Sequence, residues 1–313
     1  MNLVLVLAGL ALVTVPGATT SAGARLAPHE WARLSVASIW TGLVAIRLGL
    51  LVTAAPTALR LAGVHHLAHA CHHTLGSITP GGAITGLASA AALVVVQARI
   101  VRARHRCRTT RATLQVEPWL GQHHHRGDHD LVVIPTASQV AYALDGQPPQ
   151  VVVSQGLTRA LTADELAAVV RHERCHLEHG HQHYLELALV ADAALAPLPA
   201  VRRSTAALRL AVERWADEAA AAADHASRAA VRSALTKVVH SMLAPVAAFT
   251  AAETIAARLD ALATDHATPP THWRLAAAAP AAALAATAGL ALLTHSGHVH
   301  HGMFGLFGGC CLF

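Results

Sequence analysis

The residues with the clearest chemical potential are His172, Glu173 and His176, in the sequence His-Glu-Arg-Cys-His. Side chains four positions apart lie on one face of an α-helix, so both imidazoles can bind one Zn²⁺ ion at about 2.0–2.1 Å. Glu173 would lie beside that face, where it can take a proton from an activated water and return it to a leaving amine. The spacing therefore predicts zinc-dependent hydrolysis of an amide bond, with Glu173 as the catalytic base.

A third metal ligand is expected from the sequence Glu-Arg-Trp-Ala-Asp at positions 213–217. Catalytic zinc sites commonly use three protein ligands, and a carboxylate such as that of Glu213 is a usual third one. Asp217, one turn later, would accept a hydrogen bond from a ligand imidazole and fix its tautomer. In a chain with 24 His, an isolated His-Glu-x-x-His arises in roughly 5% of shuffled sequences. The prediction of a zinc site therefore depends on the combination of the two motifs, because Glu213 or Asp217 alone would be typical of a solvated helix face.

Two predicted helices carry these motifs. Thr162 and Glu165 form a capping box at the start of the first helix, and Gly180 indicates its end. The second helix is expected from about Thr205 to Ala223. Between them, the apolar stretch from Leu185 to Val201 contains acidic residues and two prolines. This composition favours a lid or a hairpin that touches the membrane over a complete membrane span.

A small sheet is expected before the motif helix, after the polar stretch Gln122–Asp130, which predicts a loop. Short β-branched and apolar runs predict strands at Leu131–Ile134, Val140–Leu144 and Val151–Ser154. Residues 102–272 would then form one α+β domain of the zincin-like (gluzincin) metalloprotease class, large enough for a core of its own.

The composition points to a membrane protein, because 54% of the residues are hydrophobic and only 13% are charged. Soluble domains of this size carry about 25% charged residues. A transmembrane helix needs about 20 apolar residues. Four stretches approach this length, three of them within residues 1–101: about 3–18, 34–56, 83–101 and 273–294. The predicted fold class is therefore a membrane α-helical protein with four transmembrane helices.

The distribution of arginine predicts the topology. Five arginines follow the third span between residues 102 and 111, and such clusters mark the cytoplasmic side. The domain at 102–272 would then be cytoplasmic, while the N-terminus and the tail at 295–313 would lie outside the cell membrane. The first span is expected to remain as an uncleaved anchor, because its removal would place the arginine cluster outside. Topology thus explains the net charge of +5, and no direct nucleic-acid partner is expected.

Three segments resemble the BlaR/MecR-type membrane metallopeptidases and, more distantly, the HtpX-like membrane proteases: residues 151–157, 161–176 and 213–217. The resemblance implies the same roles for the motif residues, with Zn²⁺ as the cofactor. The metal ligands would be His172, His176 and Glu213, the base would be Glu173, and Asp217 would orient a ligand. The resemblance also implies that the strand before the motif helix binds the backbone of a substrate by strand addition. That strand comprises Val151, Val152, Val153 and Ser154.

The resemblance further implies a protein substrate in the cytoplasm or near the membrane, including a transcriptional repressor cleaved in a signalling pathway (an antirepressor role). Direct β-lactam sensing is not expected. The only lysine, Lys237, follows Ser233 by four positions, so no Ser-x-x-Lys motif is formed, and only 19 residues follow the fourth predicted span. The oligomeric state is not indicated by the sequence.

Two other functions remain open. A quality-control protease of the HtpX-like kind is disfavoured, because the 36 residues between His176 and Glu213 are too few for two full spans. A non-enzymatic metal sensor is the second alternative, because His and Cys residues cluster at 65–73 and 295–311, where either metal binding or compositional bias would explain them. Cys175 is expected to pack rather than react, and none of His179, His181 and His183 is assigned a role.

Overall fold

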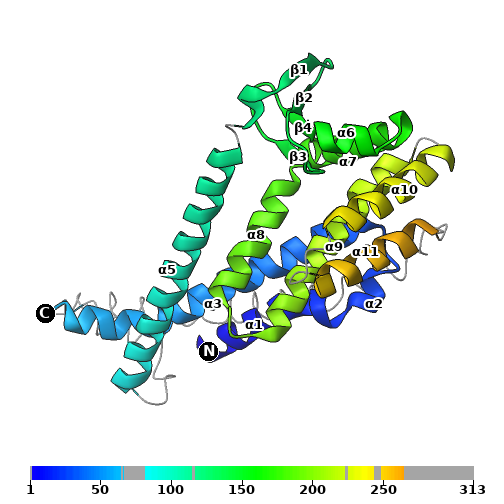
Figure 1. Cartoon of the computed structure of the whole chain (residues 1–313). Helices are drawn as coiled ribbons and strands as arrows, with labels where there is room; N and C mark the ends of the chain where they lie inside the picture. Colours follow the sequence, from blue (N-terminus) through cyan, green and yellow to red (C-terminus); the bar gives the residue numbers. More distant parts are fainter. Residues whose placement is uncertain are drawn as a thin grey trace, which may run out of the picture.

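The computed structural model describes residues 2–64, 66, 82–114, 117–222, 225–242 and 248–263. The predicted fourth span and the tail lie outside the described residues, as does the 65–73 cluster apart from His66. The described chain is mostly helical, with one small mixed sheet at one end of the molecule (Figure 1).

The described part of the first 114 residues contains three long helices with apolar stretches: α1 (Asn2–Ala18), α3 (Pro28–Leu61) and α5 (Gly82–Leu114), with the short α2 (Thr20–Gly23) after α1. Among the described residues, α3 and the helix beginning at Gly82 are long and apolar enough to cross a membrane, whereas α1 is apolar but shorter. The first three predicted spans lie within these helices. At 1.5 Å per residue, the 33 residues of α5 extend for about 50 Å, beyond the hydrocarbon thickness of about 30 Å. Its arginine-rich end therefore continues toward the sheet.

The sheet contains four strands in the order β1-β2-β4-β3, preceded by a 3₁₀ turn, η1 (Glu117–Leu120). β2 and β4 are parallel, and the other two pairs are antiparallel. The three predicted strands are confirmed with shifts of one residue at their ends. The strands are β1 (Gln122–His125), β2 (Asp130–Ile134), β3 (Ala141–Leu144) and β4 (Gln150–Ser154).

The loop expected at Gln122–Asp130 is wrong for its first four residues, which form β1. All four β1 side chains are exposed, so the segment has no alternation of apolar and polar residues to indicate a strand. Its backbone nevertheless pairs with β2, with His124 opposite Leu131. The reversal between the strands contains Gly127 at φ 82°, a conformation that glycine adopts without strain.

Helices follow the sheet and carry both motifs: α6 (Gln155–Ala160), α7 (Ala163–Glu178), α8 (His181–Ala194), α9 (Pro199–Ala221), α10 (His225–Met242) and α11 (Ala248–Ala263). The capping box of α7 is confirmed, because Thr162 accepts from the Glu165 amide and the Glu165 side chain accepts from the Thr162 amide. Gly180, at φ 61°, separates α7 from α8. The stretch predicted to be a lid or hairpin comprises most of α8, the turn after it and the start of α9.

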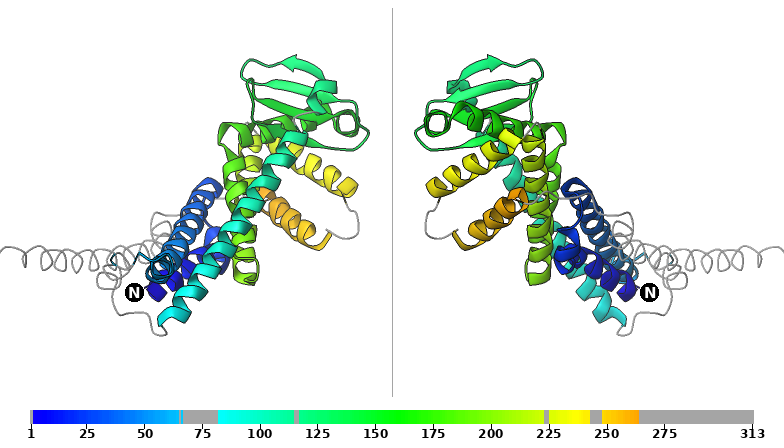
Figure 2. Two further views of the ribbon diagram at one scale, coloured as in Figure 1. Left: turned by 90° about the vertical axis from the view of Figure 1, so that its left-hand side faces the viewer. Right: turned by 90° about the vertical axis from the view of Figure 1, so that its right-hand side faces the viewer.

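The helices that carry the motifs share one hydrophobic core with α1 and α3. Figure 2 shows the ribbons of α1 and α3 beside that of α9. α1 and α3 approach closely at two glycines: a Cβ on Gly9 would lie 2.6 Å from the Gly42 carbonyl oxygen. α9 packs against both helices, and the Gly17 amide donates a 2.9 Å hydrogen bond to Ser204 Oγ on α9. The apolar helices therefore position α9 directly.

Candidate metal centre

His172, His176 and Glu213 meet at the contact between α7 and α9. Each can offer one ligand atom, and these atoms lie within 4.8 Å of one another. The two Nε2 atoms are 3.1 Å apart, and His172 Nε2 lies 3.5 Å from Glu213 Oε2. His176 Nε2 is 3.9 Å from Glu213 Oε1. Because the three side chains converge from two packed helices and are partly buried, they form a group that could hold a metal ion.

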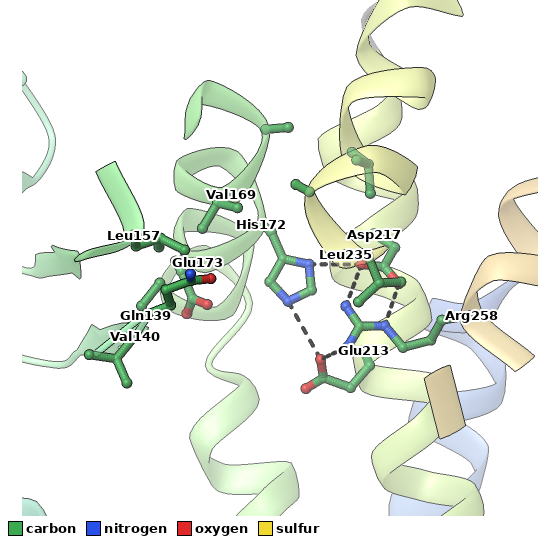
Figure 3. A pocket seen from close by; sticks show the side chains of 14 residues that line it. Gln139, Val140, Leu157, Val169, His172, Glu173, Glu213, Asp217, Leu235 and Arg258 are labelled. Carbon is green, nitrogen blue, oxygen red and sulfur yellow. Dashed lines mark hydrogen bonds and ion pairs between the residues drawn. The ribbon is translucent and has the colours of Figure 1, made fainter. Parts of the chain in front are cut away.

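Asp217 lies one turn after Glu213 on α9, and its carboxylate is almost fully buried, with 3% of the side chain exposed. Its Oδ1 atom is 3.0 Å from His172 Nδ1 (Figure 3). A carboxylate accepts the Nδ1 hydrogen of a neutral imidazole, which leaves the Nε2 lone pair free to bind a metal. The structure thus places Asp217 where it orients His172 toward Glu213 and His176.

Arg258 on α11 completes this group and had not been identified from the sequence. Its Nε and Nη2 atoms each donate a 2.7 Å hydrogen bond to the Asp217 carboxylate. Its Nη1 atom lies 3.0 Å from Glu213 Oε2. One guanidinium therefore fixes both acidic groups, with the fork geometry that suits bidentate carboxylate binding. A single charged residue between Ala257 and Leu259 was the only sequence signal.

The charges of the group shift its pKa values in opposite directions. Burial opposes the charged form of His172, but hydrogen bonds with Asp217 and Glu213 raise its pKa to about 10. Burial also opposes ionisation of Glu213, yet His172 and Arg258 lower its pKa to about 2. Burial and the neighbouring His172 lower the pKa of His176 to about 4, so this imidazole is neutral at pH 7. A neutral imidazole and an ionised carboxylate are the forms that bind metals, so His176 and Glu213 are in the binding form at pH 7, whereas His172 must release its second proton when a metal binds.

Glu173 lines a cavity of about 200 Å³ together with His172, Glu213, Asp217 and Arg258. Burial raises the pKa of Glu173 above its ordinary value, and the nearby Glu213 carboxylate adds to this effect. A carboxylate whose pKa is raised toward neutrality is better suited to exchange protons at physiological pH. Apolar side chains line the rest of the cavity, and they include Val140, Leu157, Val169, Val231 and Leu235.

The expectation that Val151, Val152, Val153 and Ser154 bind substrate by strand addition is wrong for this sheet. These residues form β4, which is hydrogen-bonded to β2 on one side and to β3 on the other. Both of its backbone edges are therefore occupied. Within the described part of the chain, β3 is the edge strand on this side, and Ala141 at its start lines the cavity beside Gln139 and Val140.

Gln139 is the second residue at this site that sequence reasoning missed. Its Oε1 atom is buried without a hydrogen-bond partner among the described residues. Figure 3 shows Gln139 on the same side of the cavity as Glu173 and Leu157. A buried amide oxygen without a partner is costly unless a ligand or water satisfies it. The side-chain oxygen of Gln139 can therefore accept a hydrogen bond from an N–H or O–H group of a ligand in the cavity.

Comparison of the chain with protein-family models, with curated proteins and with solved structures finds no match. The resemblance to BlaR/MecR-type and HtpX-like proteins accordingly stays a prediction.

Proposed function

We propose that this protein is a membrane-bound zinc endopeptidase that hydrolyses peptide bonds of a cytoplasmic or membrane-proximal protein. The supporting observation is the convergence of His172, His176 and Glu213 beside the partly buried Glu173, at a cavity that is also lined by apolar side chains. Two imidazoles and one carboxylate are a usual ligand set of hydrolytic zinc sites, and they leave a coordination position open. Asp217 meets the further requirement that a ligand imidazole be oriented by a hydrogen bond.

Zinc bound here would supply Lewis-acid polarisation of the scissile carbonyl and of a water molecule. Glu173 would accept a proton from the attacking water at its carboxylate and deliver it to the nitrogen of the leaving amine. Asp217 would keep the hydrogen of His172 on Nδ1 throughout. Arg258 would balance the charge of Glu213 and Asp217, so that neither carboxylate moves when charge develops in the cavity.

We assign substrate binding to the edge strand β3 and to the apolar side chains that line the cavity. An edge strand can take up an extended peptide through main-chain hydrogen bonds. The buried Gln139 Oε1 atom would accept from a substrate amide. The apolar lining residues, which include Val140, Leu157 and Leu235, suit an uncharged side chain next to the cleaved bond. An extended, apolar segment of a protein is therefore the substrate class that the site favours.

The proposed topology places the site on the cytoplasmic side of the cell membrane. The arginines of α5 between residues 102 and 111 lie on the part of the helix that runs toward the sheet. Such clusters remain on the cytoplasmic side of a span. A protein partner near this surface, including a transcriptional repressor in a signalling pathway, would have direct access to the cavity.

The proposal is tested with the full chain purified in detergent and a denatured protein substrate. Replacing Glu173 by Gln should reduce cleavage by about 10²–10⁴-fold while leaving the zinc content unchanged, because Glu173 is not a ligand. Glu213→Ala should lose one equivalent of zinc and all cleavage. Glu178→Gln, on the same helix outside the cavity, is the matched control and should resemble wild type. Unchanged cleavage by Glu173→Gln would exclude the proposed mechanism.

A further inference from the structure

A second group of potential ligands lies next to the first: Cys175, His179 and His181. α7 and its C-cap residue His179 carry two pairs with a spacing of four residues, His172 with His176 and Cys175 with His179. A displacement of three residues rotates the second pair by roughly 60° around the helix axis. It therefore faces a neighbouring side of α7, where α8 begins with His181.

The three side chains converge on one point. Each can offer one ligand atom, and these atoms lie within 4.8 Å of one another. Cys175 Sγ is 3.7 Å from His179 Nδ1. If Cys175 only filled space in the core, nothing would require two imidazoles to lie near its sulfur, one on each side of the break between α7 and α8. The convergence thus resembles that of the first group, with a thiol in place of the carboxylate.

His181 provides an independent indication of a ligand. Its side chain is fully buried, and its Nδ1 atom lies 3.0 Å from His176 Nδ1. Its other ring nitrogen, Nε2, is buried without a hydrogen-bond partner among the described residues. A buried ring nitrogen without a partner is unfavourable, and a ligand explains it. Of the two nitrogens, Nε2 is therefore the one available to bind a metal, in the tautomer that carries the ring hydrogen on Nδ1 and donates it to His176 Nδ1. That tautomer leaves the hydrogen of His176 on Nε2, so a metal bound here competes with one bound through His176 Nε2.

The surroundings of the group suit a soft cation. Cys175 is 2% exposed, and the ring of Trp215 packs against His179 and His181 with centroid distances of 4.6 Å. His179 is exposed and gives access from solvent. We propose that Cys175, His179 and His181 form a second metal site, separate from the proposed catalytic one, that binds a thiophilic cation such as Cd²⁺, Cu⁺ or Zn²⁺. Sulfur and imidazole ligands select such ions over Mg²⁺ and Ca²⁺. On binding, the Cys175 thiol releases its proton to solvent and the thiolate becomes the ligand.

The experiment uses the full chain in detergent with Cd²⁺ as the probe, because cadmium–thiolate bonds give an ultraviolet charge-transfer band. Cysteines elsewhere are first replaced to leave Cys175 as the only thiol: Cys71→Ser, Cys107→Ser, Cys310→Ser and Cys311→Ser. This chain should bind one equivalent of Cd²⁺ with the thiolate band. Cys175→Ser should abolish the band, and His179→Ala should weaken Cd²⁺ binding at least about tenfold. His179 is exposed, so its replacement should not disturb folding.

His183→Ala is the control, because His183 is exposed and lies on α8 outside the group. Its Cd²⁺ titration should match that of the parent chain. Absence of the band in the single-cysteine chain would overturn the proposal, as would equal weakening by His179→Ala and His183→Ala. Glu213→Ala in the same background separates the two sites. The band should persist there, so a failure of the peptidase proposal would leave this result unaffected.

Discussion

Arg258 connects the two carboxylates of the site to a third helix. A lysine at this position would keep the charge but not the paired 2.7 Å hydrogen bonds to Asp217 and the contact with Glu213. We expect Arg258→Lys to lower the zinc affinity by about 10–100-fold, as is usual when the groups that orient metal ligands are lost. Competition with a chromophoric chelator measures this affinity. Arg202→Lys, exposed on α9, is the control, and an equal affinity for both variants would exclude the role given to Arg258.

Glu165 joins α7 to α10 through a partly buried ion pair. Lys237 Nζ donates a 2.7 Å hydrogen bond to Glu165 Oε2, and Ser233 donates to Oε1. Burial opposes ionisation of Glu165, but Lys237, Ser233 and the Thr162 amide lower its pKa to about 2. A lowered pKa contributes stability above the ordinary pKa of 4.5, and this contribution is lost as the pH falls from 4.5 toward 2.

Lys237→Met should therefore destabilise the protein by about 1–2 kcal/mol at pH 7, because it leaves the Glu165 carboxylate without its counter-charge. The loss is moderated because 42% of the Lys237 side chain is exposed. The difference from wild type should shrink as the pH is lowered from 5 to about 3. Thermal unfolding in detergent at several pH values measures it, with the exposed Arg232→Met as the control. A difference independent of pH would contradict the ionic origin.

At the level of elements, α1 positions the helix that carries Glu213. The Gly17 amide bonds to Ser204, and a Cβ at Gly17 would lie 2.7 Å from the Ser204 amide nitrogen. Gly17→Val should push α9 away from α1, at a cost of about 1–3 kcal/mol for overpacking, and weaken zinc binding at the same time. Ala11→Val adds the same side chain at an exposed position of α1. Thermal unfolding measures the stability of the two variants, and titration measures their zinc affinity. Equal values for Gly17→Val and Ala11→Val would contradict the coupling between α1 and the metal centre.

Signals from residues close together in the sequence allowed some of the helices and strands to be predicted. The capping box at Thr162 and Glu165 and the three apolar strands depend on neighbouring residues, and they were found. β1 was missed because its pairing with β2 is formed by backbone groups under exposed polar side chains. The position of β4 inside the sheet was missed because strand order depends on contacts between distant segments. The same reason applies to Arg258, which reaches Asp217 from 41 residues away in sequence.

At the level of the whole molecule, the apolar helices and the metal centre are parts of one packed body. α9 buries Val201, Leu208 and Val212 in the core that also contains Val13 and Ile39 from α1 and α3. The division at residue 102 expected from hydropathy falls inside the continuous helix α5. Hydropathy located apolar segments, but it could not show that the helices of the site would pack on them. This arrangement supports the proposed position of the site close to the membrane.

The most direct test of the central proposal is a comparison of newly formed protein N-termini in cells that contain the wild-type chain or Glu173→Gln at equal levels. We predict a set of cleavages that depends on Glu173, in proteins at the cytoplasmic side of the membrane, with uncharged, apolar residues beside the cleaved bond. The apolar side chains that line the cavity and the raised pKa of Glu173 are the physical reasons for this result. Identical sets of N-termini in the two strains would contradict the assignment of this protein as a peptidase.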